Sequence, residues 1–256
     1  MNKKIKSKIL LFDIENSPNL GFCWGKHEQE IIEFKKEWYM LSFAYKWLGE
    51  KTVKVYSLPD FKSFKKDKTD DKELLQKLWE LLDEAEVVVG HNSNAFDIKK
   101  TNARFLANGM KCPSPYKTVD TLLEARKHFF FNSNKLDHLS KLLGIGDKVE
   151  TGGFGLWLEC MAGNMKAWKK MTTYNKHDVV LLEKLYLVLR PWITNHPNRA
   201  LMDSENEKAC PTCSSSEVIK QGFIYTRTGK FQRWQCKSCG AWAQSRKSER
   251  TNILLK

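Results

Sequence analysis

The sequence predicts an α/β protein in which a mixed β-sheet is flanked by helices and is followed by a small cysteine-bearing unit. Residues 8–58 hold three segments rich in aromatic and β-branched residues, as strands are. Residues 73–189 then alternate helical and strand-like patterns, which indicates helices packed on a sheet. Four of the seven cysteines gather near the C-terminus, in a segment too short to bury a large core of its own.

The strands are predicted from apolar runs that end at polar or turn-forming residues. The first run ends at Asp13, and a Gly49-Glu50 turn separates the second from the third, so we expect that pair to be antiparallel. The fourth run, EVVVG, is continuously apolar, as fully buried strands are. The expected strands cover residues 8–14, 39–48, 52–58, 86–90 and 118–120.

The helices are predicted from apolar residues that recur every three to four positions. Gly109 and Gly144 follow two of these patterns, as glycines follow helix C-termini, and Pro191 ends the last one. Asp120 with Thr121 is typical of a helix N-cap. The expected helices cover residues 73–82, 95–108, 136–143 and 173–189.

The net charge favours a polyanionic partner. The formal charge is +13, from 43 Lys and Arg against 30 Asp and Glu, and such an excess attracts nucleic acid. The alternative is a basic surface that serves solubility alone. The apolar run at residues 9–12 is too short for a signal peptide, and no run approaches the roughly 20 apolar residues of a membrane span. We therefore expect a cytoplasmic protein with no membrane partner.

Four carboxylates are expected to meet at one edge of the sheet. Asp13 and Glu15 alternate with apolar residues at the end of a strand, so both acids face one side. Asp97 follows the EVVVG strand closely. Tyr174 and Asp178 are four residues apart on the last helix, which places their Cβ atoms about 5–6 Å apart on one face.

Carboxylates gathered in one cleft repel one another, so they must take up protons or bind cations. Divalent metal is the usual answer, since Mg²⁺ and Mn²⁺ prefer oxygen ligands. Two such ions about 3.5–4 Å apart suit hydrolysis of a phosphodiester, in which one ion activates water and both stabilise the reacting oxygens. Tyr174 is then expected to orient or to deprotonate that water.

Three segments resemble a known family in their order and separation. Residues 12–16 (FDIEN), 91–97 (HNSNAFD) and 174–178 (YNKHD) are similar to the three motifs of the DEDD (DnaQ-like) 3′-to-5′ exonucleases. The resemblance extends over residues 8–190 and implies an RNase H-like fold. It also implies a two-metal hydrolase that releases nucleoside 5′-monophosphates stepwise.

The resemblance implies roles for single residues. The implied metal ligands are Asp13, Glu15, Asp97 and Asp178. The spacing of Tyr174 to Asp178 resembles the Tyr branch of the family (DEDDy), because the His branch has His where Thr173 stands. Asn92 matches a substrate-side Asn of polymerase proofreading domains. Asn16 departs from the family, in which a small hydroxyl residue is common there, and this alters how the 3′ end is expected to sit.

The resemblance implies DNA as substrate more than RNA. We expect as partner a polymerase or another replication, repair or mobile-element protein. Two other functions stay open at this point: a structure-specific endonuclease on the same fold, and a catalytically weak DNA-binding or regulatory protein.

The C-terminal cysteines predict a zinc ribbon. Two C-x-x-C pairs separated by 22 residues have the spacing of a structural four-thiolate zinc site: Cys210, Cys213, Cys236 and Cys239. We therefore expect an exonuclease domain at residues 1–195, a linker at 196–208 and the ribbon at 209–256. The basic and aromatic residues expected to contact nucleic acid are Arg227, Lys230, Arg233 and Trp234. The alternatives are that the ribbon's aromatics form its small core, or that it contacts protein.

Overall fold

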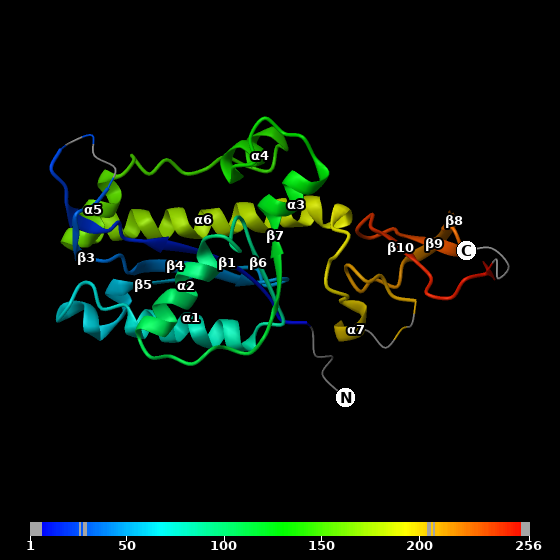
Figure 1. Ribbon diagram of the computed structural model, residues 1–256, viewed down its shortest axis with the longest axis horizontal. Coiled ribbons are helices and arrows are strands. Elements are labelled where there is room, and N and C mark those ends of the chain that lie inside the picture. The colour runs from blue at the N-terminus through cyan, green and yellow to red at the C-terminus, as the bar shows by residue number, and fades with distance from the viewer. Residues whose placement is uncertain (1–6, 26, 28–29, 204–205, 207, 252–256) are drawn as a thin grey trace. The chain divides into compact units, whose positions relative to one another are not determined.

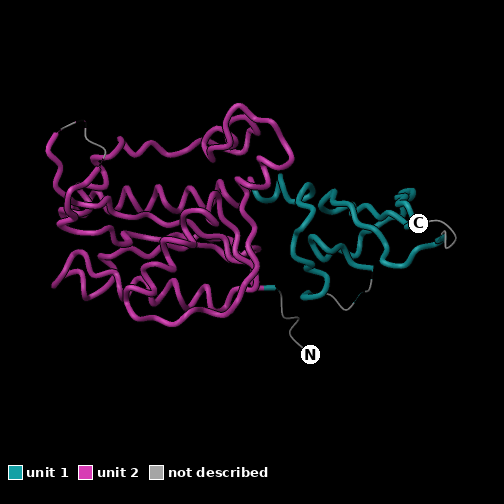
Figure 2. The backbone as a smooth tube through the Cα atoms, viewed as in Figure 1, with its two compact units in different colours: residues 1–7, 186–256 teal, residues 8–185 magenta. Residues whose placement is uncertain are grey.

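The computed structural model describes residues 7–25, 27, 30–203, 206 and 208–251. The chain divides into two compact units (Figure 2): residues 8–185 form one, and residues 186–256 with residues 1–7 form the other. In the described ranges, no helix is long and apolar enough to cross a membrane.

The larger unit is built on a five-stranded mixed sheet with the order β5-β4-β1-β6-β7. The central strand β1 pairs antiparallel with β4 and parallel with β6, and the outer pairs continue each pattern. The strands are β1 (Ile9–Asn16), β4 (Met40–Trp47), β5 (Lys54–Ser57), β6 (Val87–Gly90) and β7 (Lys117–Asp120). The predicted turn between the second and third expected strands is confirmed, since Glu50 N donates to Trp47 O at 3.0 Å.

Helices cover both faces of this sheet, with α6 along one face and α1 and α2 on the other (Figure 1). The helices are α1 (Lys72–Glu84), α2 (Asp97–Ala107), α3 (Thr121–His128), α4 (Leu136–Leu142), α5 (Gly155–Ala162) and α6 (Met165–Leu189). Short 3-10 helices cover Leu58–Asp60, Lys62–Lys65 and Arg190–Trp192. The predicted mixed α/β sheet flanked by helices is confirmed.

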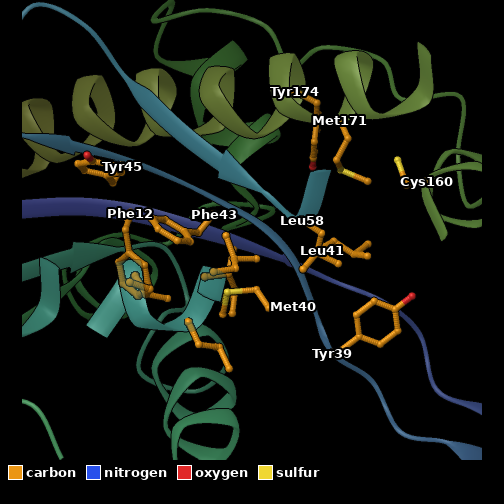
Figure 3. Packing of buried hydrophobic residues seen from close by; sticks show 14 of the residues in the cluster. Phe12, Tyr39, Met40, Leu41, Phe43, Tyr45, Leu58, Cys160, Met171 and Tyr174 are labelled. Carbon is orange, nitrogen blue, oxygen red and sulfur yellow. The ribbon is translucent and has the colours of Figure 1, made fainter. Parts of the chain in front are cut away.

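The strand β1 is apolar because helices cover both faces of the sheet. Its first four residues, ILLF, are all buried, because alternate side chains face opposite helical layers. Phe12 packs in one cluster with Phe43 of β4, and Met171 and Tyr174 join this cluster from α6 (Figure 3). The core therefore holds β1 and α6 in fixed relation.

Several elements differ from the sequence prediction. The last helix begins at Met165 rather than at residue 173, because Asn164 Oδ1 caps it by accepting from Lys166 N at 2.9 Å. The helix α5 was missed because it is short and apolar on nearly all sides, so no amphipathic period marks it. A two-stranded hairpin, β2 (Leu20–Phe22) with β3 (Glu33–Lys36), was also missed.

The smaller unit contains a four-stranded sheet in which β9 is central. Its elements are α7 (Ala200–Asp203), β8 (Val218–Tyr225), β9 (Gly229–Cys236), β10 (Trp242–Gln244) and β11 (Arg250–Thr251). A hairpin joins β8 to β9, and Thr226 N donates to Gly229 O at 2.9 Å at its turn. The segment expected to be a linker holds α7, which an Arg199–Asp203 ion pair of 2.8 Å supports.

Candidate active site

Three carboxylates meet where β1 ends beside α6. Asp13, Glu15 and Asp178 each offer an oxygen, and these oxygens lie within 4.8 Å of one another. Strand alternation carries the first two acids to the same side, and the helix supplies the third. Such a group of hard oxygen donors suits a divalent cation.

Asn175 fixes the orientation of Asp13. Its side-chain nitrogen donates to Asp13 Oδ2 at 2.7 Å and to the Asp13 carbonyl at 3.2 Å. Its side-chain oxygen accepts from the Ser42 hydroxyl at 3.0 Å, and the whole residue is buried. Because both ends of this amide are satisfied, it holds one oxygen of Asp13 and leaves the carboxylate little freedom to rotate. The sequence reasoning missed Asn175, since nothing in its spacing marks it.

Asp97 opens α2 and lies against the same strand, but it is not one of the three clustered acids. Its Oδ1 accepts from Ile14 N at 3.2 Å, and its side chain is buried. Asp97 nevertheless raises the pKa of Asp13 through charge repulsion. The structure therefore places it within electrostatic reach of the cluster.

Tyr174 points toward the cluster from α6, one turn before Asp178. Lys148, from the segment between α4 and α5, donates to the Tyr174 hydroxyl at 2.7 Å and pairs with Asp178 Oδ2 at 2.8 Å. The ring of Trp157 meets the Tyr174 ring edge-on at 6.3 Å. Lys148 is a second residue that sequence reasoning missed, because it lies in a loop outside any motif.

Burial and mutual repulsion dominate the electrostatics of the site. Burial, and then the charge of Asp178, raise the pKa of Glu15 to about 8, and burial raises that of Asp97 to about 6. The pKa of Asp13 is raised well above its ordinary value by burial and by its acidic neighbours. Burial and the same acids raise the pKa of Tyr174, so its hydroxyl stays protonated at neutral pH. A protonated phenol can orient a water molecule but cannot act as its base.

The residues fit a metal centre. Within the described part of the chain, Asp178 Oδ1 is buried and has no hydrogen-bond partner. A buried oxygen without a partner is unfavourable unless a cation or a donor satisfies it. The orphaned oxygen and the crowded acids both indicate a positive ligand.

Two cavities adjoin the carboxylates. The larger, of about 1040 Å³, is lined by Asp13, Tyr174 and Asp178. The other, of about 550 Å³, is lined by Glu15, and Thr151 borders both.

His91 and Asn92, the two residues that follow β6, border the larger cavity. Asn92 has a left-handed backbone, with φ of +64°, and its N–H donates to Asp120 Oδ1 at 2.8 Å. His91 is held between the Thr121 hydroxyl and the Asn134 carbonyl, each at 2.9 Å. Asp120 also accepts from Leu122 N at 3.0 Å, which confirms the predicted helix cap.

The four C-terminal cysteines sit in two similar turns. In the first, Ser214 N donates to Cys210 O at 2.8 Å, and in the second, Gly240 N donates to Cys236 O at 2.9 Å. Ser214 and Gly240 have φ of +63° and +78°, so each turn ends on a left-handed residue. This repeated geometry directs both cysteine pairs toward one point.

The sulfur atoms form a compact cluster in which all four Sγ lie within 4.8 Å of one another. Cys210 and Cys239 are 3.8 Å apart, and Cys213 and Cys236 are 3.6 Å apart. A tetrahedron with Zn–S bonds of about 2.3 Å has sulfur–sulfur edges of about 3.8 Å. The cluster is therefore compatible with one zinc ion.

The expected nucleic-acid contacts of this unit do not share one face. Alternation along β9 puts Lys230 and Trp234 on one side of the sheet and Arg233 on the other. The Lys230 ammonium lies 3.7 Å from the centre of the Phe223 ring. Arg227 lies in the turn between β8 and β9 and is exposed.

A sequence profile described as RNase_H superfamily matches residues 33–190, more than half of the chain. The chain belongs to the RNase H superfamily. The matched region includes Asp97, Tyr174 and Asp178 and begins after Asp13 and Glu15. No curated protein matches the sequence.

The RNase H-like fold agrees with the solved structures. The family B DNA polymerase from the hyperthermophilic archaeon Pyrobaculum calidifontis is similar, with a TM-score of 0.53 and 16% sequence identity. The similarity covers 78% of this chain and 28% of the polymerase chain, and at this identity it shows the fold alone. The predicted RNase H-like fold is thus confirmed. Membership of the RNase H superfamily supports a nuclease, and the acidic and cysteine clusters are both compatible with metal.

Proposed function

We propose that this protein is a metal-dependent 3′-to-5′ exonuclease of the Tyr branch of the DEDD family, acting on DNA more than on RNA. The observation that carries the proposal is the acidic triad, three carboxylates from β1 and α6 within 4.8 Å. The superfamily match and the RNase H-like fold support a nuclease. The direction of digestion rests on the resemblance of the three sequence motifs.

Each residue of the site has a proposed task. The residues that would hold two Mg²⁺ or Mn²⁺ ions are Asp13, Glu15, Asp97 and Asp178. When bound, the ions supply an activated water and stabilise charge on the reacting phosphate. Asn175 orients Asp13, as its two hydrogen bonds to that residue indicate.

Tyr174 and Lys148 act together on the proposed substrate. The Tyr174 hydroxyl oxygen accepts from Lys148 at 2.7 Å, so the hydroxyl can donate its own proton to another oxygen, such as that of Asp178, water or phosphate. The Lys148 ammonium adds positive charge close to the carboxylates, where a phosphate must enter. Both side chains therefore position the reacting groups, and neither removes the proton from water.

The two cavities suit different parts of a nucleic acid. The larger contains Asn92 and three lysines, but five acids also line it, so it suits the phosphate backbone once divalent cations occupy the carboxylates. The smaller contains Phe96, Phe154 and Trp157, whose rings suit a nucleobase. We assign the smaller cavity to the terminal nucleoside.

The C-terminal unit is proposed to be a zinc ribbon that binds nucleic acid. In this proposal residues 1–195 are the exonuclease domain, 196–208 a linker and 209–256 the ribbon, with structural zinc on the four cysteines. The ribbon would target the nuclease to DNA, and a polymerase or another replication, repair or mobile-element protein is the proposed partner.

The experiment that tests the proposal is product analysis. End-labelled single- and double-stranded DNA and RNA are incubated with the protein and Mg²⁺ or Mn²⁺, and the products are sized. We expect mononucleotides released from the 3′ end, and we expect Asp13→Ala and Asp178→Ala to abolish cleavage. Asp137→Ala is the matched control, because Asp137 lines the larger cavity and pairs with Lys141 but is not one of the three clustered acids. Internal fragments would identify an endonuclease, and cleavage that survives in Asp13→Ala and Asp178→Ala would refute the catalytic assignment.

The role of the ribbon is tested by the salt dependence of DNA binding. Each cation that contacts a phosphate contributes about 1 to the slope of log affinity against log salt concentration. Because Lys230 and Arg233 lie on opposite faces, Lys230→Ala and Arg233→Ala should reduce this slope unequally and thereby identify the binding face. An unchanged slope in both variants would assign the ribbon to protein contacts instead.

A further inference from the structure

Asn16 carries an unsatisfied amide next to the acidic triad. It is the last residue of β1, and the pairing with β4 shifts between Glu15 and Asn16, where Leu41 is the extra residue of β4. In the described part of the chain, neither its side-chain oxygen nor its side-chain nitrogen has a hydrogen-bond partner, although both atoms are buried. Bulges of this kind recur beside active sites, and a buried amide without partners is costly.

The surroundings of Asn16 can be matched to the phosphate, the sugar and the base of a nucleotide. Glu15, the preceding residue, belongs to the triad at which the phosphate would react. Asn16 lines the smaller cavity together with Phe96, Phe154 and Trp157, whose rings suit a base. In a nucleotide the sugar lies between the phosphate and the base. Asn16 borders the same cavity as Glu15 and the aromatic rings, and is thus placed for the sugar.

The chemistry of an amide matches the hydroxyl edge of a sugar. The Asn side chain both donates and accepts, and so does each hydroxyl. Since the amide has an unsatisfied group at each end, two neighbouring hydroxyls satisfy it better than one. Ribose presents a 2′- and a 3′-hydroxyl on one edge, whereas 2′-deoxyribose presents only the 3′-hydroxyl.

We propose that Asn16 reads the hydroxyl edge of the terminal nucleoside in the smaller cavity and favours a 3′-terminal ribonucleotide over a deoxynucleotide. This inference rests on the proposed function, because it assumes that a nucleotide end occupies the site. The inference concerns the last sugar only, so the favoured substrate is a DNA strand whose 3′-terminal nucleotide is a ribonucleotide.

The test uses three DNA strands that differ only in their last sugar: ribose, 2′-deoxyribose and 2′,3′-dideoxyribose. The variant Asn16→Leu keeps the shape of the side chain and removes its polar atoms. For the unaltered protein we expect kcat/KM for release of the terminal nucleotide to fall by roughly 2- to 13-fold for each hydroxyl removed, as one hydrogen bond accounts for. Asn16→Leu should treat all three ends alike and should match the unaltered protein on the dideoxy end. Asn102→Leu, an exposed position on α2, is the matched control and should leave the preference unchanged.

A second measurement does not depend on cleavage. Binding of AMP, dAMP and 2′,3′-dideoxy-AMP is measured by calorimetry, with Mg²⁺ present, for the same proteins. Affinity that falls from AMP to dAMP to 2′,3′-dideoxy-AMP in the unaltered protein, but not in Asn16→Leu, supports the inference. If this result is obtained without any cleavage, only the proposed function fails. If cleavage depends on Asp13 but the unaltered protein and Asn16→Leu show the same ratio between ends, the inference on Asn16 is wrong and the proposed function stands.

Discussion

Replacing Lys148 by Met tests whether this lysine balances the charge of the acidic cluster. Lys148 pairs with Asp178 at 2.8 Å, and the two side chains are 30% and 4% exposed. Breaking a fully buried pair costs about 3–5 kcal/mol, and an exposed pair contributes at most about 1 kcal/mol. For this half-buried pair we expect a loss of about 2 kcal/mol in the free energy of unfolding without metal. For a unit of this size that lowers Tm by about 4–8 °C.

Divalent metal should remove most of this penalty. Once Mg²⁺ or Mn²⁺ neutralises the carboxylates, the missing ammonium matters less, so the loss should fall below about 1 kcal/mol. Urea and thermal unfolding with and without Mg²⁺ measure both quantities. Lys141→Met is the control, since its pair with Asp137 is 55% and 41% exposed and should contribute within about 0.5 kcal/mol in either condition. An equal loss for Lys148→Met with and without metal would refute the charge-balancing role.

Three further predictions concern the site and the ribbon. Tyr174→Phe removes the hydroxyl held by Lys148 and should slow cleavage by about 100-fold without changing the Mg²⁺ concentration needed for stabilisation; unchanged turnover would exclude Tyr174 from the mechanism. The pKa of Glu15 rises from 4.5 to about 8 on folding, so the folded state holds more protons between these values. The metal-free protein should therefore lose stability as pH rises from about 4.5 to about 8 and recover it with Mg²⁺, and a rising or flat pH profile would contradict this. Cys236→Ser should reduce bound zinc, measured by elemental analysis, from one per chain to none and open the smaller unit to proteolysis, whereas the Mg²⁺ response of residues 8–185 should persist.

The fold could be predicted from the sequence wherever the burial of one or both faces of an element produces a regular pattern of apolar residues. The apolar first half of β1, the EVVVG strand and the leucine pattern of α1 each record which faces are covered, and the structure confirms all three. The hairpin of β2 and β3 could not be predicted in this way. Leu20, Phe22 and Phe34 are all about half exposed, so the pattern expected of a half-buried strand is missing.

In the candidate site, too, some residues could be predicted from the sequence and others could not. Alternation places Asp13 and Glu15 on one side of a strand, and helical spacing places Asp178 beside Tyr174, because regular elements fix where their side chains point. That the strand and the helix contribute to one site was implied by the resemblance of the three motifs. Lys148 and Asn175 could not be predicted. The first reaches the cluster from a loop whose path depends on tertiary packing. The second is buried in the core, where an amide is marked only by its partners, Asp13 and Ser42.

The distribution of charge implies an order of events in the proposed reaction. The protein as a whole carries +13, so it attracts a polyanion at long range, whereas the acidic triad repels a phosphate at short range. Metal reverses the local charge and leaves the long-range attraction nearly unchanged. Metal and a strand end should therefore strengthen each other's binding by the same factor, since linkage is reciprocal. Internal stretches of DNA, which do not enter the site, should bind almost equally with and without Mg²⁺ at constant ionic strength. If a strand end bound with the same affinity with and without Mg²⁺, the terminal phosphate would not approach the carboxylates at all.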